Sequence, residues 1–200
     1  QKVLVKQRHQ QRALRPRHKL PVIALVGYTN AGKSTLLNTL TKNNVRASNQ
    51  VFTTLDTASR RLRLLTGKEA ILTDTVGFIQ KLPRGLLGAF QTTLDELRNA
   101  SLLLHVCDIT SSSLDDRLNT VTNVLSELSL NNIPSLLVLN KADKVSEMQR
   151  QTLGYRLSGI TISAIDATSL SPLLHAIDEH LYATTPVSYT QMPLPPSDLV

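Results

Sequence analysis

The fold is decided by the stretch Gly27-Tyr28-Thr29-Asn30-Ala31-Gly32-Lys33-Ser34, which has the spacing G-x-x-x-x-G-K-S. It follows an apolar run at 22–26 and opens into a helix-prone segment at 35–40. The glycines let the backbone curl so that successive N–H groups face phosphate oxygens, and the positive end of the helix dipole adds to them. The sequence therefore predicts a polyphosphate site at this stretch and Thr35, with a plain strand-to-helix turn as the alternative.

Side chains around this stretch predict a site for Mg²⁺ beside the phosphates. Lys33 can reach the β- and γ-phosphates, and the hydroxyl of Ser34 can bind the metal. Asp74 ends a candidate strand and can hold Mg²⁺ from the other side, usually through water. A loop follows, Asp74-Thr75-Val76-Gly77. The N–H of Gly77 would bind the γ-phosphate, so this loop could sense hydrolysis.

A second motif, Asn140-Lys141-Ala142-Asp143, follows the apolar run at 135–139. Ligands of open α/β sheets bind at the carboxyl ends of strands. The carboxylate of Asp143 can accept two hydrogen bonds from guanine, whereas adenine would leave it unpaired, so the motif predicts guanine selectivity. Asn140 can tie the loop to the phosphate loop, and the stem of Lys141 can lie along the base. The alternative is that Asp143 caps a helix at 144–153.

The polar segment 43–57 contains Phe52-Thr53-Thr54-Leu55-Asp56. A threonine here could complete the Mg²⁺ shell only while the γ-phosphate is present. A plain surface loop is the alternative for this segment.

At this point the chain resembles the HflX family of ribosome-associated GTPases, within the translation-factor-related class of small GTP-binding proteins. The resemblance rests on GYTNAGKS at 27–34, FTTLD at 52–56, DTVGF at 74–78, IQKLPRGLL at 79–87 and the motif at 140–143. It runs from about Arg8 to Leu181. Two departures are that Thr53 stands where the family often has Ala, and that the family's own N-terminal domain is missing.

The resemblance implies a Ras-like P-loop GTPase domain that binds GTP and GDP and works with the large ribosomal subunit and its RNA. It favours Thr54 over Thr53 as the metal ligand, so the expected ligands of Mg²⁺ are Ser34, Thr54 and Asp74. The expected catalytic residues are Lys33, Thr54 and Gly77. It also implies that the backbone N–H groups of Ser163 and Ala164 bind the guanine.

The expected rate of hydrolysis is low. Many GTPases place Gln directly after the glycine of D-x-x-G, but here Phe78 follows Gly77 and cannot polarise water. In potassium-stimulated relatives an Asn at the position of Asn30 helps ligate K⁺; the alternative is that Asn30 only hydrogen-bonds the loop. Two functions stay open, a GTPase that splits, rescues or assembles ribosomes and a GTP-gated RNA- or protein-binding module with negligible turnover. A third function, an ATPase, would require that Asp143 does not bind guanine.

Alternating apolar and helix-prone segments predict an α/β fold, with a mainly parallel six-stranded sheet and helices on both faces. We expect strands at 22–26, 58–65, 69–74, 102–108, 134–139 and 159–163, and helices at 33–41, near 86–99, and at 114–129, 145–153 and 170–182. In the second strand Arg61 and Arg63 alternate with Leu62 and Leu64. This pattern predicts a half-exposed edge strand, paired antiparallel with its neighbour.

The formal net charge of +7 comes from the first 19 residues. Residues 1–19 hold seven basic residues and no acid, so we expect a basic helical arm that binds RNA phosphates or joins a missing N-terminal domain. The GTP-binding domain should span 20–182, followed by a Pro-rich tail at 183–200. The single cysteine allows no disulfide within the chain, which suits a reducing compartment, and no apolar run reaches membrane-spanning length. We expect the cytoplasm, with an organellar matrix as the alternative, and a monomer.

Overall fold

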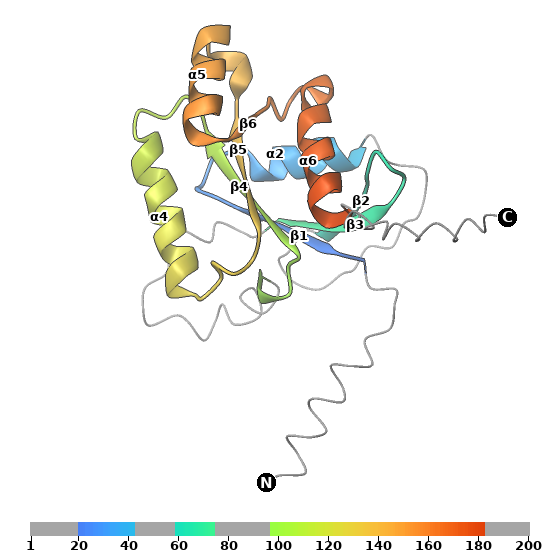
Figure 1. The fold of residues 1–200 in the computed structure, drawn as a ribbon. Helices are drawn as coiled ribbons and strands as arrows, with labels where there is room; N and C mark the ends of the chain where they lie inside the picture. The colour runs from blue at the N-terminus through green and yellow to red at the C-terminus, as the bar shows by residue number, and fades with distance from the viewer. Residues whose placement is uncertain (1–19, 43–58, 75–96, 183–200) are drawn as a thin grey trace, which may run out of the picture.

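The computed structural model describes residues 20–42, 59–74 and 97–182 (Figure 1). In chain order the elements are β1 (Val22–Val26), α2 (Lys33–Lys42), β2 (Ser59–Arg63), β3 (Glu69–Asp74), β4 (Leu102–Asp108), α4 (Leu114–Glu127), β5 (Ser135–Asn140), η1 (Ala142–Lys144), α5 (Glu147–Leu157), β6 (Ile160–Thr161), η2 (Ala167–Leu170) and α6 (Ser171–Tyr182). The two η segments are short 3₁₀ helices. The arm, the tail and most of the helix expected near 86–99 lie outside the described residues.

The six strands form one sheet in the order β2-β3-β1-β4-β5-β6 (Figure 1). Every neighbouring pair is parallel except β2 and β3, which are antiparallel. The predicted α/β fold and its mainly parallel six-stranded sheet are confirmed. From β1 the strand order runs one way to β3 and the other way to β4, and such a switch point is where open α/β sheets bind ligands.

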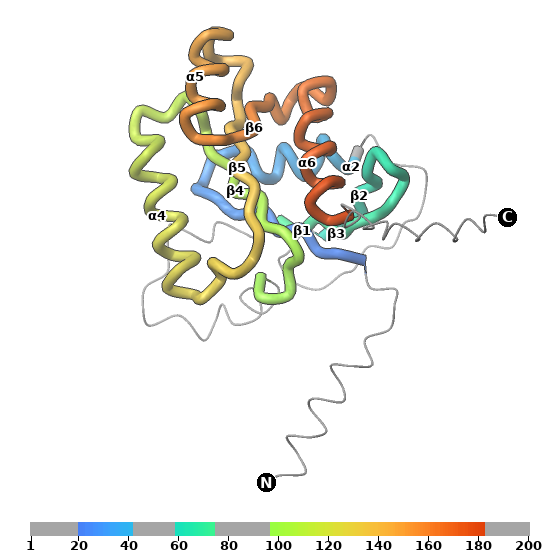
Figure 2. Tube along the Cα trace, in the orientation of Figure 1, coloured from blue at the N-terminus to red at the C-terminus, as the bar shows by residue number. Residues whose placement is uncertain are grey.

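The core lies in layers on both faces of the sheet, because successive strand residues point to opposite sides. On β1, Ile23 and Leu25 pack in the cluster that includes α2 and α6, whereas Ala24 and Val26 pack in the cluster on the opposite face. Figure 2 shows α4 beside one face of the sheet and α2 and α6 beside the other. Both faces of the central strands are therefore buried, and their carboxyl ends are left to carry polar loops.

Strand β2 is an edge strand, as predicted, although it is shorter than expected. Its residues are exposed except Leu62, which is fully buried and packs with the α2 and α6 layer. Charged residues on an edge strand hinder pairing with another chain. The alternation of arginine and leucine therefore indicates an edge strand with one buried face.

Helix α5 begins and ends later than the sequence indicated. Ser146 precedes it as the N-cap and forms a capping box with Gln149, so the helix begins at Glu147. Gly154 does not end the helix. A Cβ at Gly154 would lie 3.3 Å from Cγ2 of Thr161, so this glycine permits close packing of α5 on β6. The helix ends only at Ser158, which adopts a left-handed conformation with φ of 49°.

Helix α6 is joined to the β2–β3 hairpin by side-chain contacts. Asp178 is 7% exposed and accepts hydrogen bonds from the backbone N–H and the hydroxyl of Thr66, both at 2.8 Å. The hydroxyl of Tyr182 donates to the carbonyl of Glu69 at 2.7 Å, and the ammonium of Lys68 lies 4.3 Å from the centroid of the Tyr182 ring. These contacts fix the hairpin to a helix more than 100 residues later in the chain. In the described ranges no helix is both long and apolar enough to cross a membrane.

Replacing Asp178 by Ala should lower the free energy of unfolding by about 2 kcal/mol, because the backbone N–H and the hydroxyl of Thr66 both lose a charged acceptor. Glu179 is the next residue and is exposed, so Glu179→Ala is the matched control and should change the stability little. Urea denaturation followed by circular dichroism measures both. Equal stability of the two variants would contradict the assigned role of Asp178.

Candidate functional site

The phosphate-binding stretch forms the turn between β1 and α2, as the motif predicted. Gly27 follows β1 with φ of 145°, and a Cβ there would lie 2.2 Å from the carbonyl oxygen of Val106. Gly32 has φ of 95°, and its carbonyl accepts the hydrogen bond from Leu36 N–H at 2.9 Å that begins α2. Both positions need glycine, one for its close approach to β4 and the other for the turn into the helix.

Lys33 is buried at the start of α2, with 7% of its surface exposed. Its ammonium donates to the carbonyls of Gly27 and Tyr28, each at 3.0 Å, so it closes over the loop that it belongs to. Burial lowers the pKa of Lys33, and the negative charge of Asp74 opposes this shift. A phosphate group placed in the loop would further favour the charged ammonium. The side chain therefore suits binding to an anion.

Ser34, in the first turn of α2, meets Asp74 at the end of β3, the strand that pairs with β1. The hydroxyl of Ser34 donates to Oδ2 of Asp74 at 2.6 Å. The other carboxylate oxygen, Oδ1, is buried and has no hydrogen-bond partner within the described residues. Buried polar atoms are normally satisfied, so an unpaired carboxylate oxygen beside a hydroxyl fits a hard cation or its water.

The pair of Ser34 and Asp74 suits Mg²⁺ better than a metal ion that needs three or more protein side chains as ligands. No cluster of three or more His, Cys, Asp or Glu side chains occurs in ranges 20–42, 59–74 and 97–182. Mg²⁺ needs few protein ligands, because it keeps several waters and binds phosphate oxygens of its substrate. A hydroxyl and one carboxylate are therefore sufficient.

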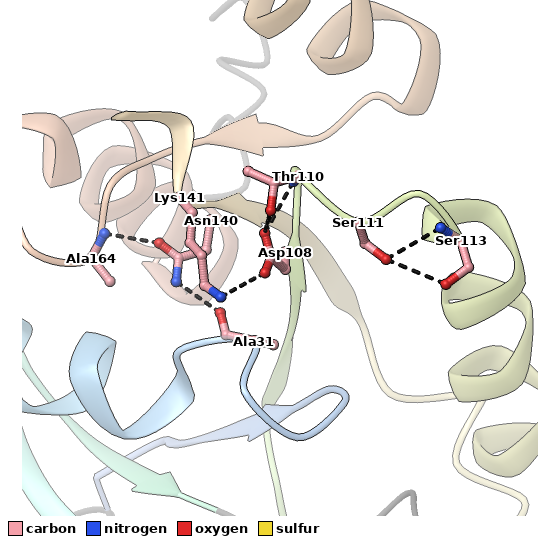
Figure 3. A network of polar contacts seen from close by, with 8 residues as sticks. All are labelled: Ala31, Asp108, Thr110, Ser111, Ser113, Asn140, Lys141 and Ala164. Carbon is pink, nitrogen blue, oxygen red and sulfur yellow. Dashed lines mark hydrogen bonds and ion pairs between the residues drawn. The ribbon is translucent and has the colours of Figure 1, made fainter. Parts of the chain in front are cut away.

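Asn140 joins the phosphate loop to the second predicted motif (Figure 3). Its side chain is 2% exposed, and its Nδ2 donates to the carbonyl of Ala31 at 2.8 Å. Its Oδ1 accepts from the N–H of Ala164, also at 2.8 Å. The tie between the two loops expected from the sequence is present, and the same amide reaches the loop after β6.

Asp143 lies in the 3₁₀ helix η1 with its carboxylate exposed, three residues before the cap of α5. Ser146 caps α5, so the interpretation of Asp143 as a helix cap is wrong. Oδ1 of Asp143 accepts a hydrogen bond from the hydroxyl of Ser163 at 2.6 Å. The serine fixes the carboxylate, which leaves an acceptor at the surface for a ligand to cover.

Ser163 and Ala164 follow the shortened strand β6, where their N–H groups bind other parts of the chain. Ser163 N–H donates to the hydroxyl of Ser169 at 2.9 Å, and Ala164 N–H donates to Asn140. Their predicted contact with guanine stays a prediction, in which the base would share these donors. Ser169 was missed by the sequence analysis, since a hydroxyl six residues downstream carries no pattern.

Asp108 was also missed. It ends β4 and pairs in register with Asn140 at the end of β5. Its Oδ2 accepts a hydrogen bond from the ammonium of Lys141 at 2.5 Å (Figure 3). The signal that could have found it is the one used for Asp74, an acidic residue at the carboxyl end of a buried strand.

Two further side chains of the phosphate loop are exposed or surface-facing. Asn30 is exposed and left-handed, with φ of 61°, a conformation that Asn tolerates. The guanidinium of Arg117 on α4 lies 5.2 Å from the centroid of the Tyr28 ring. The binding of K⁺ by Asn30 stays a prediction.

A buried pair lies on β4 near the phosphate loop and takes no part in this site. Nε2 of His105 lies 3.3 Å from Sγ of Cys107. Burial lowers the pKa of His105 to about 4 and raises the pKa of Cys107 to about 12. Both groups are therefore neutral near pH 7, and Cys107 is the inert core residue that its apolar surroundings suggest.

The remaining predicted site residues lie outside the described residues, and their contacts stay predictions. These are Phe52, Thr53, Thr54, Leu55, Asp56, Thr75, Val76, Gly77 and Phe78.

Comparisons with known proteins agree with this arrangement. Residues 22–141 match a family model described as 50S ribosome-binding GTPase. The chain is 45% identical over 184 residues to a GTPase HflX of Caldanaerobacter subterraneus subsp. tengcongensis, covering 92% of this chain and 42% of that protein. It is 39% identical over 196 residues to the GTPase HflX of Escherichia coli, covering 96% of this chain and 46% of that protein. The chain thus spans less than half of these relatives.

A solved structure gives the same fold. The GTP-binding protein from the archaeon Sulfolobus solfataricus, in complex with GDP, aligns with a TM-score of 0.64 and 29% identity. The alignment covers 90% of this chain and 56% of that one.

Gly32 provides a test of the contact between the two loops. A Cβ at Gly32 would lie 2.2 Å from Nδ2 of Asn140, so Gly32→Ala should displace the amide and lower the free energy of unfolding by about 3 kcal/mol. Gly67→Ala is the matched control, because Gly67 also has a positive φ, of 83°, but only a side-chain atom 3.9 Å away. The control should cost about 1 kcal/mol in urea denaturation. A Gly32 variant no less stable than the control would show that the loops are not in close contact.

Proposed function

The chain belongs to the HflX family of GTP-binding proteins, and from this premise we propose that it binds GTP and GDP and hydrolyses GTP in connection with the large ribosomal subunit. The observation that carries the proposal is the position of Asn140. Its buried amide holds the phosphate loop against the loop that bears Asp143. A nucleotide with its phosphates in one loop and its base in the other would span this junction.

The phosphates of GTP would lie in the turn between β1 and α2. The backbone N–H groups of the turn and the ammonium of Lys33 bind the β- and γ-phosphates, where Lys33 exchanges its carbonyl partners for phosphate oxygens. Ser34, Asp74 and Thr54 would hold Mg²⁺, which offsets the negative charge on the phosphates. The unpaired oxygen of Asp74 supports this assignment.

Guanine would be read by the loops after β5 and β6. The carboxylate of Asp143 accepts from N1–H and the exocyclic amine of the base, while Ser163 keeps it oriented through the bond at 2.6 Å. The N–H groups of Ser163 and Ala164, which donate to Ser169 and Asn140, would share these bonds with the base carbonyl. Adenine would leave the carboxylate unpaired.

Hydrolysis is attack of water on the γ-phosphorus with loss of GDP, so the bond to the bridging oxygen breaks and phosphate forms. Lys33 stabilises the charge that develops, and Gly77 N–H and Thr54 would contact the γ-phosphate side. Phe78 cannot orient the water, so we expect slow intrinsic turnover that a partner accelerates. K⁺ bound through Asn30 is a second source of compensating charge.

Coupling to the large ribosomal subunit is supported by the description of the matched family, 50S ribosome-binding GTPase. Splitting, rescue or assembly of ribosomes are the forms that this coupling could take. We propose that residues 20–182 act as a monomeric GTP-binding domain in the cytoplasm, with residues 1–19 as a basic arm joining an N-terminal domain and 183–200 as a tail.

A second candidate function is a GTP-gated module that binds RNA or protein with negligible turnover. Phe78 favours it, since the position directly after the glycine carries no polar group for catalysis. Measured turnover on the ribosome separates the two functions.

Asp143→Asn should weaken GDP binding by about 100-fold, because the amide replaces an acceptor of two hydrogen bonds with a group that repels one donor. The variant should gain affinity for xanthosine diphosphate, whose base offers an acceptor to the new amide. Isothermal titration calorimetry measures both ligands. Asp166→Asn is the control, because Asp166 lies in a nearby loop and bonds within it to Thr168. Unchanged GDP affinity of the Asp143 variant would remove the assigned base contact.

GTP hydrolysis should be slow for the chain alone and faster with purified large ribosomal subunits. Phosphate release is measured in K⁺ and in Na⁺, with and without subunits, and Lys33→Ala should abolish turnover in every condition. A faster rate only in K⁺ would assign Asn30 as a cation ligand. Tight GTP binding without turnover in any condition would favour the binding module instead.

A further inference from the structure

The feature with no assigned role is the contact between Asp108 and Lys141, which joins the ends of β4 and β5 (Figure 3). Oδ2 of Asp108 lies 2.5 Å from the ammonium of Lys141. The two side chains are 15% and 26% exposed, so this pair is better shielded from water than the surface pair of Asp115 and Arg156. Shielded, hydrogen-bonded ion pairs hold a side chain more firmly than exposed ones.

Asp108 is itself fixed by the turn that follows it. Its Oδ1 accepts hydrogen bonds from the N–H of Thr110 at 3.0 Å and from the Thr110 hydroxyl at 2.7 Å. Each carboxylate oxygen therefore has its own partner, Thr110 for Oδ1 and Lys141 for Oδ2. Burial alone would raise the pKa of Asp108, but the hydrogen bonds from Lys141 and Thr110 hold the pKa below its usual value. The carboxylate is charged at neutral pH and points in one direction.

The backbone of Lys141 is fixed as well. The residue is left-handed, with φ of 66°, between Asn140, which binds the phosphate loop, and Ala142, whose N–H donates to Ile162 at 3.0 Å. Its side chain starts in the base-reading loop and ends at Asp108. A lysine held at both ends has lost most of its rotamer freedom before any ligand arrives.

We propose that Asp108 is a positioning residue for guanine-nucleotide binding, which acts by holding the aliphatic stem of Lys141 as a preformed wall of the base site. The inference rests on the proposed function. A free lysine would have to be ordered when the nucleotide binds, and that cost would weaken the affinity. With the ammonium on Asp108, the methylene groups are available for the face of the base.

Thr110 supports the same arrangement indirectly, because it binds Asp108 and not Lys141. It contacts the carboxylate and makes no contact with Lys141 among the hydrogen bonds of the described residues. Loss of its hydroxyl should loosen Asp108 partially. The effects on binding should therefore rank Asp108 above Thr110.

The test is the dissociation constant of GDP for the full chain, measured by isothermal titration calorimetry. Asp108→Asn keeps the shape of the side chain but loses its charge, and should weaken GDP binding about tenfold. Thr110→Val should weaken it about threefold. Asp115→Asn is the matched control, since Asp115 pairs with Arg156 on the surface, and should leave the dissociation constant unchanged.

A double-mutant cycle separates positioning from a general structural effect. Lys141→Met keeps an aliphatic stem without the ammonium. If Asp108 acts through Lys141, Asp108→Asn should weaken binding less than twofold when Lys141 is already Met. A tenfold loss in both backgrounds would show that Asp108 acts by another route and would overturn the inference. Thermal unfolding of each variant identifies any loss of GDP affinity that comes from misfolding. If Asp108→Asn misfolds, the affinity of Thr110→Val provides the test.

Two results distinguish failure of the inference from failure of the proposed function. An unaltered chain that does not bind GDP would overturn both. An unaltered chain that binds GDP, together with an Asp108→Asn variant of equal or higher affinity, would overturn the positioning role alone.

Discussion

The site depends on one side-chain amide, that of Asn140, which is buried and uses both of its ends. Its Nδ2 donates to Ala31 in the phosphate loop, and its Oδ1 accepts from Ala164 after β6. An amide is suited to this place because it is donor and acceptor at once. A carboxylate or an apolar side chain would leave a buried backbone group unpaired, at a cost comparable to that of a lost hydrogen bond. Gly32 is required by the same contact, because a Cβ would meet Nδ2.

The parallel sheet brings these loops together. Leu25 pairs with Asp74 across β1 and β3, and Asp108 pairs with Asn140 across β4 and β5. The carboxyl ends of β1, β3, β4 and β5 therefore lie on one edge of the sheet. At this edge the apolar strand residues give way to the polar side chains of Asp74, Asp108 and Asn140. Since both faces of these strands are buried, the edge is the place where the sheet can present polar groups to a ligand.

Local pattern was enough to predict most of the fold and part of the site. The spacing of glycines predicted the phosphate loop, apolar runs predicted the central strands, and the alternation of arginine with leucine predicted the edge strand. Patterns failed where a residue acts through a distant partner. The helix expected at 145–153 missed both ends of α5, because the Ser146 cap sets its start and Gly154 lies inside the helix, where it packs against Thr161. Asp108 and Asp178 bind Lys141 and Thr66, and such pairings depend on register and on helix placement that no local pattern contains.

The hairpin of β2 and β3 connects the described frame to the predicted γ-phosphate contacts. Thr54 precedes β2 and Gly77 follows β3 by a few residues, so both segments start from a hairpin whose position is fixed. Asp178 and Tyr182 of α6 hold the turn and the second strand of this hairpin. Strand β3 ends at Asp74, whose Oδ2 accepts the hydrogen bond from Ser34, so this anchoring also holds the strand that carries the candidate metal site. Helix α6 therefore stabilises, through the hairpin, the strand that ends at Asp74.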